Sequence, residues 1–404
     1  MEQLKGFFVK PDALFFNTHS NELHRDSNEL DGCRAILIGP ESRKGHGSGG
    51  KKEHGEQAWD ESEADIISAL EPYDQIIFVF GLGGGTGLGC AGKLAEYLCQ
   101  DNNSLKGKTI ILTEILPDLG FDLPKQSQVK EQHAKIKKSG YPVLLIDQAK
   151  QLDLALQINQ DVGLKEFLER NGEQFARIIS VISSILLDQL NTGSLDRSDL
   201  HEILQESPND SMGLYVGVGS AVKVDSSETT AQVDEVVKKL WELSLLNLTS
   251  KDIQNNTHRL ILVAYAVGDI PLVLMREVNS LKSKFANKPA ILIGSTELKP
   301  NDSNDKAVMG LLGLKEEGDL AIAMIAVGAH YISESNDEHF QLPELKVEVG
   351  DGSETASRED GIEPAASRST DEKKGDSRTH RHILKDEVAA AEKSADVTNL
   401  VVNK

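Results

Sequence analysis

Residues 81–89 are a run of glycines interrupted by one threonine and two leucines (GLGGGTGLG). The run follows the apolar segment QIIFVF (75–80) and precedes the helix-like segment CAGKLAEYL (90–98). Glycines let backbone N–H groups approach phosphate oxygens, and a helix N-terminus adds positive potential. Thr86 adds a hydroxyl donor. A strand, a glycine-rich turn and a helix in this order therefore predict a phosphate-binding loop.

Two familiar phosphate-loop patterns fit this chain poorly. GLGCAGK (87–93) fits GxxxxGK, but Leu94 stands where a P-loop needs Ser or Thr to hold magnesium. GHGSGG (45–50) fits GxGxxG, but it does not directly follow the strand-like segment AILIG (35–39). The helix after it also starts too late for a dinucleotide-binding fold. The sequence therefore disfavours a P-loop enzyme and a Rossmann oxidoreductase.

The elements that must position the loop are short apolar runs alternating with helix-like stretches. Continuous apolar runs are typical of strands buried on both faces of a parallel sheet. We expect an α/β parallel-sheet nucleotide-binding domain over residues 1–163. The expected strands are 13–17, 35–39, 75–81, 109–116 and 142–147, and the expected helices are 62–71, 90–100 and 126–140.

A long helical pattern follows at 164–190, and NTGS (191–194) ends it. We interpret 164–192 as a central helix between two domains. Residues 193–340 then predict a second, smaller α+β domain. Its expected strands are 212–221, 259–267, 289–298 and 320–330, with helices at 230–245 and 271–286.

Residues 341–404 contain no Phe, Trp or Tyr and are rich in Ser, Glu, Asp, Gly and Lys. Such a segment buries too little apolar surface to offset chain entropy, so we predict a disordered acidic C-terminal tail. Its end, 383–402, could form a short helix, either solvated or docking a partner. Cutting the chain after Phe340 is expected to leave thermal stability nearly unchanged.

The chain of 404 residues has 43 Lys and Arg against 64 Asp and Glu, a net charge of −21. Such a surface repels nucleic-acid phosphates and anionic lipids, so we expect no nucleic-acid partner. Three cysteines without CxxC spacing favour a reducing compartment and no structural metal site. The N-terminus lacks the apolar core of a signal peptide, and no run of ~18 apolar residues occurs. We expect a cytoplasmic protein without membrane insertion.

The segment GGGTGLG (83–89) resembles the signature loop of the tubulin/FtsZ superfamily. Residues 36–61, with their Lys-Gly-His-Gly run, resemble the nucleotide loops of its archaeal CetZ branch. The order and spacing of these segments agree with the family over roughly residues 12–330. The further segments that carry the resemblance are FFNTHSNEL (15–23), ILP (115–117), LLIDQAKQL (144–152), FLERN (167–171) and SLDRSDL (194–200).

The resemblance implies the family's fold, GTP as ligand and Mg²⁺ as its counter-ion, and self-association into filaments. Asn17 and Gln148 would contact the nucleotide, and Gly47 and Gly49 would let a loop close over the γ-phosphate, although both glycines also fit a plain flexible loop. Phe167 would stack on guanine, or serve as an ordinary core aromatic. Asn171 would hydrogen-bond the guanine edge. The residues that would hold the phosphates are Gly83, Gly84, Gly85, Thr86, Gly87, Leu88 and Gly89.

Asp196 and Asp199 are three residues apart and would share one face of a helical turn. Taken alone, they fit a helix N-cap after NTGS. The resemblance implies a catalytic role instead, in which the pair reaches the nucleotide of the next subunit and orients the attacking water. No protein-borne metal ligand is predicted.

The sequence departs from the family at its start and in two loop residues. The family begins with a strand and a first phosphate loop, but only MEQLKGFFVKPD precedes residues 13–17. Either the start is truncated, which we favour because loss of a central strand would expose sheet edges, or this copy is degenerate. Leu88 and Ser194 replace a hydroxyl residue and an asparagine.

Two hypotheses follow: a polymerising GTPase, or a non-hydrolysing structural or regulatory paralogue. A role in cell division or in cell shape stays open.

Overall fold

The structure of the chain is a computed structural model. The residues that the structure describes are 12–28, 33–117, 123–148, 151–152, 155–156, 161, 163–186, 192–193, 197–205, 213–219, 222–223, 234–236, 238, 257–268, 285, 288–328 and 398–403.

The N-terminal half contains the five predicted strands. They are β1 (Asp12–Asn17), β2 (Cys33–Leu37), β3 (Gln75–Gly81), β4 (Thr109–Leu116) and β5 (Val143–Asp147). β1 pairs with β2, β3 pairs with β4, and β4 pairs with β5, in every case parallel. The carboxyl ends of these strands consequently lie at one edge of the sheet, where loops in parallel folds commonly bind ligands.

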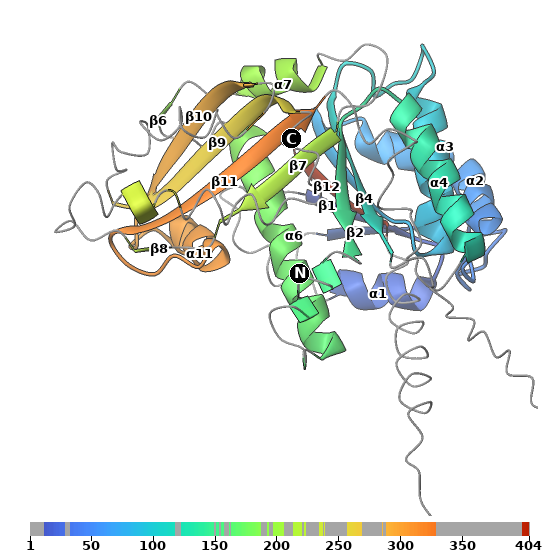
Figure 1. Ribbon diagram of the computed structural model, residues 1–404. Coiled ribbons are helices and arrows are strands. Elements are labelled where there is room, and N and C mark those ends of the chain that lie inside the picture. Colours follow the sequence, from blue (N-terminus) through green and yellow to red (C-terminus); the bar gives the residue numbers. More distant parts are fainter. Residues whose placement is uncertain are drawn as a thin grey trace, which may run out of the picture.

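Helices cover this sheet on both faces. α1 (Ser20–Asn28) follows β1, and α2 (Lys52–Leu70), α3 (Gly85–Leu98) and α4 (Leu123–Lys138) pack in a row along one face (Figure 1). α2 begins ten residues before the helix predicted at 62, and α3 begins five residues before the helix predicted at 90. Glycine has a low helix propensity, so the glycines near the two starts prevented the prediction of the first turns of both helices.

Alternate residues of β3 belong to two different cores. Ile77 and Val79 pack with the long helix of the chain, whereas Ile76, Phe78 and Phe80 pack under α2, α3 and α4. The strand is buried on both faces, which explains its uninterrupted apolar sequence and confirms the parallel-sheet interpretation.

The long helix α6 (Leu164–Leu186) lies between the two halves of the molecule (Figure 1). Its last carbonyl, that of Leu186, accepts a hydrogen bond of 2.9 Å from Nε2 of Gln75, the first residue of β3. The C-terminal end of α6 is thereby tied to the amino edge of the sheet. Because α6 spans about 34 Å at 1.5 Å per residue, its first turns reach toward the carboxyl edge.

The second half contains a mixed set of strands that continue the first sheet. β5 pairs in parallel with β7, but only through Val143 with Gly213 and Leu144 with Leu214. The predicted second sheet is therefore joined to the first by a short ladder. Its elements are β6 (Thr192–Gly193), α7 (Arg197–Gln205), β7 (Gly213–Val218), β8 (Val222–Lys223), β9 (Thr257–Val267), β10 (Ala290–Leu298), α11 (Ser303–Leu312) and β11 (Asp319–Gly328).

Parts of the predicted organisation fall outside the described residues. The helix predicted at 230–245 is described only at 234–236 and 238, and the helix predicted at 271–286 is not described. The tail predicted at 341–404 is described only at 398–403. The domain boundaries at 163, 192 and 340 stay predictions.

The end of the tail forms a strand that the sequence did not predict. β12 (Thr398–Asn403) lies between β1 and β3 and is antiparallel to both. The short helix expected over 383–402 is therefore wrong for residues 398–402. The expectation that a cut after Phe340 is harmless is also revised, because the cut would remove a strand paired on both edges.

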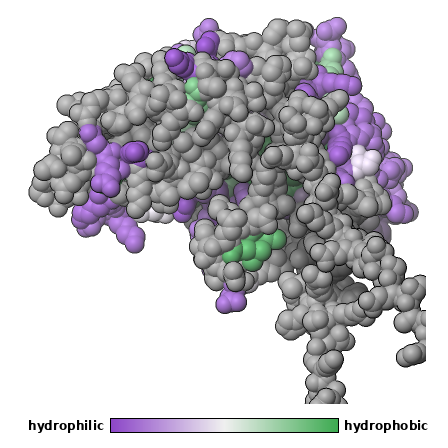
Figure 2. All heavy atoms as spheres, in the orientation of Figure 1, coloured by the Kyte–Doolittle hydropathy of each residue, from purple (hydrophilic) through white to green (hydrophobic). Residues whose placement is uncertain are grey.

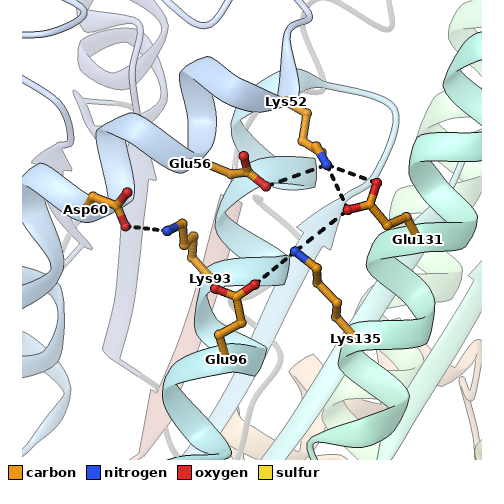
Figure 3. Close-up of polar contacts among 7 residues, drawn as sticks. All are labelled: Lys52, Glu56, Asp60, Lys93, Glu96, Glu131 and Lys135. Atoms are coloured by element: carbon orange, nitrogen blue, oxygen red, sulfur yellow. Dashed lines mark hydrogen bonds and ion pairs between the residues drawn. The ribbon is translucent and has the colours of Figure 1, made fainter.

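Charged side chains join α2, α3 and α4 on their outer side (Figure 3). Lys52 of α2 lies 3.0 Å from Glu131 of α4, and Lys135 of α4 lies 2.9 Å from Glu96 of α3. Lys93 and Asp60 make a further pair of 2.7 Å.

Within the described part of the chain, no helix has the length and apolar character that a membrane span requires.

Candidate functional site

Three loops meet at the carboxyl edge of the N-terminal sheet. They follow β1 (18–19), β2 (38–51) and β3 (82–84). Thr18 Oγ1 lies 2.7 Å from Thr86 Oγ1, and both side chains are buried. The backbone N–H of Gly47 donates to the carbonyl of Thr18 over 3.0 Å. Thr18 and Thr86 are thus the point at which the three loops are fastened together.

The glycine run is the N-terminus of α3. Gly84 is the N-cap residue, its φ and ψ are extended, and no side chain caps the helix. The first N–H groups of a helix have no intrahelical acceptor. Gly85 has no room for a side chain, because a Cβ there would lie 2.5 Å from the Lys51 nitrogen. The predicted residues Gly83, Gly84, Gly85 and Thr86 therefore form the turn and first helical residues, as an anion-binding loop requires.

The other predicted phosphate residues lie inside α3 and pack. Leu88 is fully buried in the core under α2, and its N–H donates to the Gly84 carbonyl. A Cβ on Gly87 would lie 2.3 Å from the Gly81 carbonyl oxygen, and one on Gly89 would lie 2.5 Å from the Glu56 nitrogen. Gly87 and Gly89 thus allow close packing of α3 on β3 and α2.

The loop after β2 follows a path of left-handed turns. φ is +79° at Gly47 and +61° at Gly49, a region that glycine enters without steric cost. A Cβ on Gly47 would meet the His19 ring at 3.2 Å, whereas Gly49 faces open space. Gly47 is therefore packed against the loop after β1. Of the two glycines predicted to let the loop close over a phosphate, Gly49 is the one with open space beside it.

Side chains of α2 hold the start of this loop. The carboxylate of Glu61 accepts hydrogen bonds from the backbone nitrogens of Glu41 and Ser42, at 2.6 and 3.0 Å. Interactions with Ser42, and to a smaller extent with the backbone of Glu41, lower the pKa of the Glu61 carboxyl. Ser62 Oγ accepts a bond of 2.9 Å from the Gly39 N–H. The loop consequently has a fixed base next to its glycine-rich part.

Asn17 and Gln148 both lie at strand ends on this edge. Asn17 ends β1 and is buried; its Oδ1 accepts from the His19 N–H, and its Nδ2 donates to Glu22 Oε2 over 3.3 Å. Its side chain thus holds the turn into α1. Gln148 directly follows β5 and is half-buried.

Phe167 and Asn171 lie in the first two turns of α6. Phe167 is buried, which fits both a core aromatic and a stacking partner. Asn171 is half-buried, and its Nδ2 atom is shielded from solvent without a hydrogen-bond partner among the described residues. A buried amide donor without an acceptor is costly, so a ligand that supplies the acceptor would be favoured here.

Asp199 lies on α7, away from these loops. His201, two residues later on the same helix, contacts Thr109: its Nδ1 atom lies 2.8 Å from Thr109 Oγ1. Thr109 is the first residue of β4, so α7 lies at the amino edge of the sheet. α7 and α1 accordingly lie at opposite ends of the molecule (Figure 1). Asp196 lies outside the described residues.

Thr18 is the site residue that the sequence interpretation passed over. Its signal was the Asn-Thr pair at the end of β1, of which only Asn17 was chosen. Among the described residues, no group of three or more His, Cys, Asp and Glu side chains could hold a metal ion.

Comparison with known proteins confirms the family resemblance. Residues 2–136 match the model of the "Tubulin/FtsZ family, GTPase domain". Cell division protein FtsZ 1 of Pyrococcus furiosus is 24% identical over 323 residues, covering 79% of this chain and 76% of the relative. Mitochondrial division protein fszB of Dictyostelium discoideum is 29% identical over 177 residues, covering 43% of this chain and 46% of the relative.

Solved structures share the fold. An empty FtsZ dimer of M. jannaschii matches with a TM-score of 0.58 and 21% identity, over 78% of this chain and 80% of that chain. CetZ2 from Haloferax volcanii, in a GTPγS-bound protofilament, matches with a TM-score of 0.62 and 18% identity, over 81% of this chain and 86% of that chain. The α/β architecture of this chain is similar to that of these two solved structures.

Proposed function

We propose, from the premise that this chain carries the GTPase domain of the tubulin/FtsZ family, that it binds GTP and polymerises head to tail, hydrolysing GTP where two subunits meet. The observation that carries the proposal is the placement of two groups at opposite edges of one sheet. Thr18 and Thr86 lie at the carboxyl edge, and the helix of Asp199 is fastened to the amino edge through His201.

The residues at the carboxyl edge fit a guanine nucleotide. The uncapped N-terminus of α3 offers backbone N–H groups to phosphate oxygens, and Thr86 adds a hydroxyl. The unpartnered Asn171 Nδ2 donor would meet the acceptor on the guanine edge, and Phe167 in the same helix would stack on the base. The bound GTP supplies the phosphoryl group, with Mg²⁺ arriving as its counter-ion.

Hydrolysis requires a positioned water near the γ-phosphate, whereas the Glu22 and Glu61 carboxylates at the carboxyl edge already accept hydrogen bonds from Asn17 and from the backbone of the loop after β2. Asp199, with Asp196, would supply it from the neighbouring subunit by accepting a hydrogen bond from the attacking water. A head-to-tail contact repeats without closing, so it builds a filament. The related structures, a dimer of M. jannaschii FtsZ and a protofilament of Haloferax volcanii CetZ2, agree with such a contact.

An exposed apolar surface at the carboxyl edge favours self-association. Leu168, next to Phe167 on α6, is 42% exposed, and Leu156 is 38% exposed. They are the large hydrophobic side chains exposed within the described part of the chain. Figure 2 shows a hydrophobic patch where the lower end of α6 lies in Figure 1. Such a patch at one end of the subunit would be covered by the next subunit.

A second candidate is a non-hydrolysing paralogue that keeps the fold and associates without turnover. It is favoured by Leu88, which stands where the family carries a hydroxyl and is here a core residue. Cell division and control of cell shape, both in the cytoplasm, are compatible cellular roles.

The test is GTP hydrolysis measured over a range of protein concentrations, together with competition binding of labelled GTP against excess ATP. Specific activity should rise with concentration, because the complete site forms only between subunits, and ATP should displace GTP poorly. Activity independent of concentration would contradict the shared site. Binding without hydrolysis at high concentration would favour the paralogue, and equal displacement by ATP would remove the guanine assignment.

A further inference from the structure

β12 occupies a position inside the sheet, although it belongs to the far C-terminal end of the chain. Phe15 of β1 and Val79 of β3 both face Asn399, and the same double pairing continues along the strand to Val402. β12 is antiparallel to both neighbours, whereas β1 and β3 each continue outward in parallel pairs. Figure 1 shows this strand, in red, inside the N-terminal sheet.

This strand is the connection between two parts of the sheet. In the strand order of the described residues, β1 and β3 do not neighbour each other; β12 stands between them. On one side lie β1 and β2, and on the other side lie β3, β4, β5 and all the strands of the second half. Without β12, two rows of backbone N–H and C=O groups would lose their partners.

The two strands that β12 joins are deeply buried. Leu14 and Phe15 of β1, and Ile76 and Phe78 of β3, are at most 2% exposed. A gap between β1 and β3 would open these side chains to water or let the strands collapse onto each other. Collapse would shift β1 relative to β3 by about one strand spacing of 4.8 Å.

β1 and β3 also lead directly into the phosphate-site loops. Thr18 follows the last residue of β1, and Thr86 lies five residues after the end of β3. Their hydroxyl groups are 2.7 Å apart. A shift of one strand spacing would break this contact, so the position of β12 sets the geometry of the candidate site.

We propose that Thr398–Asn403 is a donor strand: the slot between β1 and β3 binds an extended peptide, and its occupant is the C-terminal segment of the same chain. The segment is suited to this role, because Thr398, Val401 and Val402 are β-branched and favour the extended conformation. Main-chain pairing on both edges provides the affinity, as in other cases of strand addition. The effect of β12 on GTP binding rests on the proposed function, whereas the donor strand itself does not.

The first test is a disulfide across the predicted register in the full chain. Val79→Cys with Asn399→Cys introduces cysteines at directly opposite positions, whose spacing in an antiparallel pair suits a disulfide. The control is Val79→Cys with Ser394→Cys, which leaves position 399 unchanged. Oxidised glutathione should link the first pair within one chain, seen as a monomer with a new cross-linked peptide by mass spectrometry, and leave the control largely unlinked.

Two results of this test would overturn the proposal. Equal linking of the test and control pairs would show that the segment has no fixed register. A linked dimer in place of a linked monomer would show that the strand comes from a second copy.

The second test is hydrogen exchange of the unmodified chain and of two proline variants. Val401→Pro removes a backbone donor from a strand paired on both edges, and Val388→Pro makes the same change outside the described strands. In the unmodified chain, amides of 398–403 should be protected at least tenfold over unstructured peptide. Val401→Pro should remove that protection and raise exchange in β1, whereas Val388→Pro should not.

The exchange test separates this inference from the proposed function. Unprotected amides at 398–403 in the unmodified chain would overturn the donor strand, whether or not GTP binds. Protected amides without GTP binding would leave the donor strand in place and remove the nucleotide assignment. If both hold, Val401→Pro should weaken GTP binding at least tenfold while Val388→Pro leaves it unchanged; equal binding by the two would disconnect β12 from the site.

Discussion

His201 Nδ1 lies 2.8 Å from Oγ1 of Thr109, and this contact fastens α7 to the first residue of β4. β4 ends seven residues later at Leu116, on the edge that carries the candidate phosphate-site loops. At about 3.3 Å per residue the strand separates the two edges by more than 20 Å. Asp199, two residues before His201, is therefore too far away to act on a nucleotide bound at the proposed site of its own chain. Any catalytic role for it requires a second subunit.

Asp199→Asn should reduce GTP hydrolysis by a factor on the order of 10²–10³, the usual effect of losing one positioned carboxylate. GTP binding should stay nearly intact, because the carboxylate lies at the other edge of the sheet. Glu202→Gln, the same loss of charge at an exposed position on α7, is the control and should retain activity. Loss of GTP binding by Asp199→Asn in a folded protein would contradict the separation of the two groups.

Mixing two inactive variants should restore part of the activity. Asn171→Ala impairs the proposed pocket, and Asp199→Asn impairs the carboxylate, so one of the two mixed contacts pairs an intact pocket with an intact Asp199. Hydrolysis by the equimolar mixture should exceed that of either variant at the same total concentration. A mixture no more active than its components, with both variants folded, would rule out a site shared between subunits.

Asn171→Ala should weaken GTP binding at least tenfold and leave the melting temperature unchanged or slightly raised. The reason is that the Asn171 Nδ2 atom is buried without a partner in the described structure, so its removal relieves a desolvation cost while a ligand hydrogen bond is lost. The measurements are equilibrium binding and thermal unfolding of the same samples. A large fall in melting temperature without loss of GTP affinity would make Asn171 a structural residue.

The parts of the fold that could be predicted are those in which local sequence and burial agree. β3 and β4 are mostly apolar because both of their faces are covered, and their apolar runs were sufficient to identify them. The start of α3 was missed because Gly85, Gly87 and Gly89 have low helix propensity. Their place in the helix depends on close contact with α2 and β3, which local propensity does not contain.

β12 could not have been predicted for a different reason. Its pairing partners, β1 and β3, lie more than 300 residues earlier in the chain, and the surrounding composition is that of a solvated tail. The pairing of Thr18 with Thr86 is similar, because two hydroxyls 68 residues apart carry no sequence pattern. Both features depend on which strands become neighbours, and this is decided by the whole sheet.

Gly89→Ala should destabilise the protein by about 1–3 kcal/mol, since its methyl group would lie 2.5 Å from backbone atoms of Lys52 and Glu56 and would force α3 away from α2. Gly310→Ala in α11 is the matched control, because a Cβ there meets nothing within 4 Å. That change should stabilise the protein by up to about 1 kcal/mol through helix propensity. Denaturant unfolding of both variants checks this, and equal effects would show that the α2–α3 contact is looser than described.

Tyr265→Phe should cost about 1 kcal/mol of unfolding free energy. Tyr265 of β9 is buried, its hydroxyl lies 2.8 Å from Ser184 Oγ of α6, and burial raises the pKa of its phenol. The bond joins the central helix to the second half of the sheet. A double-mutant cycle with Ser184→Ala should give a coupling energy of roughly 1 kcal/mol between the two hydroxyls. Strictly additive effects would mean that the contact contributes nothing of its own.

Glu131→Gln should lower stability at neutral pH by at most about 1 kcal/mol, because the side chain is half exposed and water screens its charge. The hydrogen bond from Lys52 is the largest cause that lowers the pKa of Glu131 below its ordinary value of 4.5. A lowered carboxyl pKa contributes stability above the ordinary value, and this contribution is lost as the pH falls through the lowered value. The difference in unfolding free energy between Glu131→Gln and the unmodified chain should therefore be full at pH 7 and shrink below pH 4.5. Glu169→Gln, which breaks a longer and more exposed pair with Lys165, is the control and should change little at either pH. A difference for Glu131→Gln that is constant from pH 7 down to strongly acidic pH would show that its charge does not stabilise the α2–α4 contact.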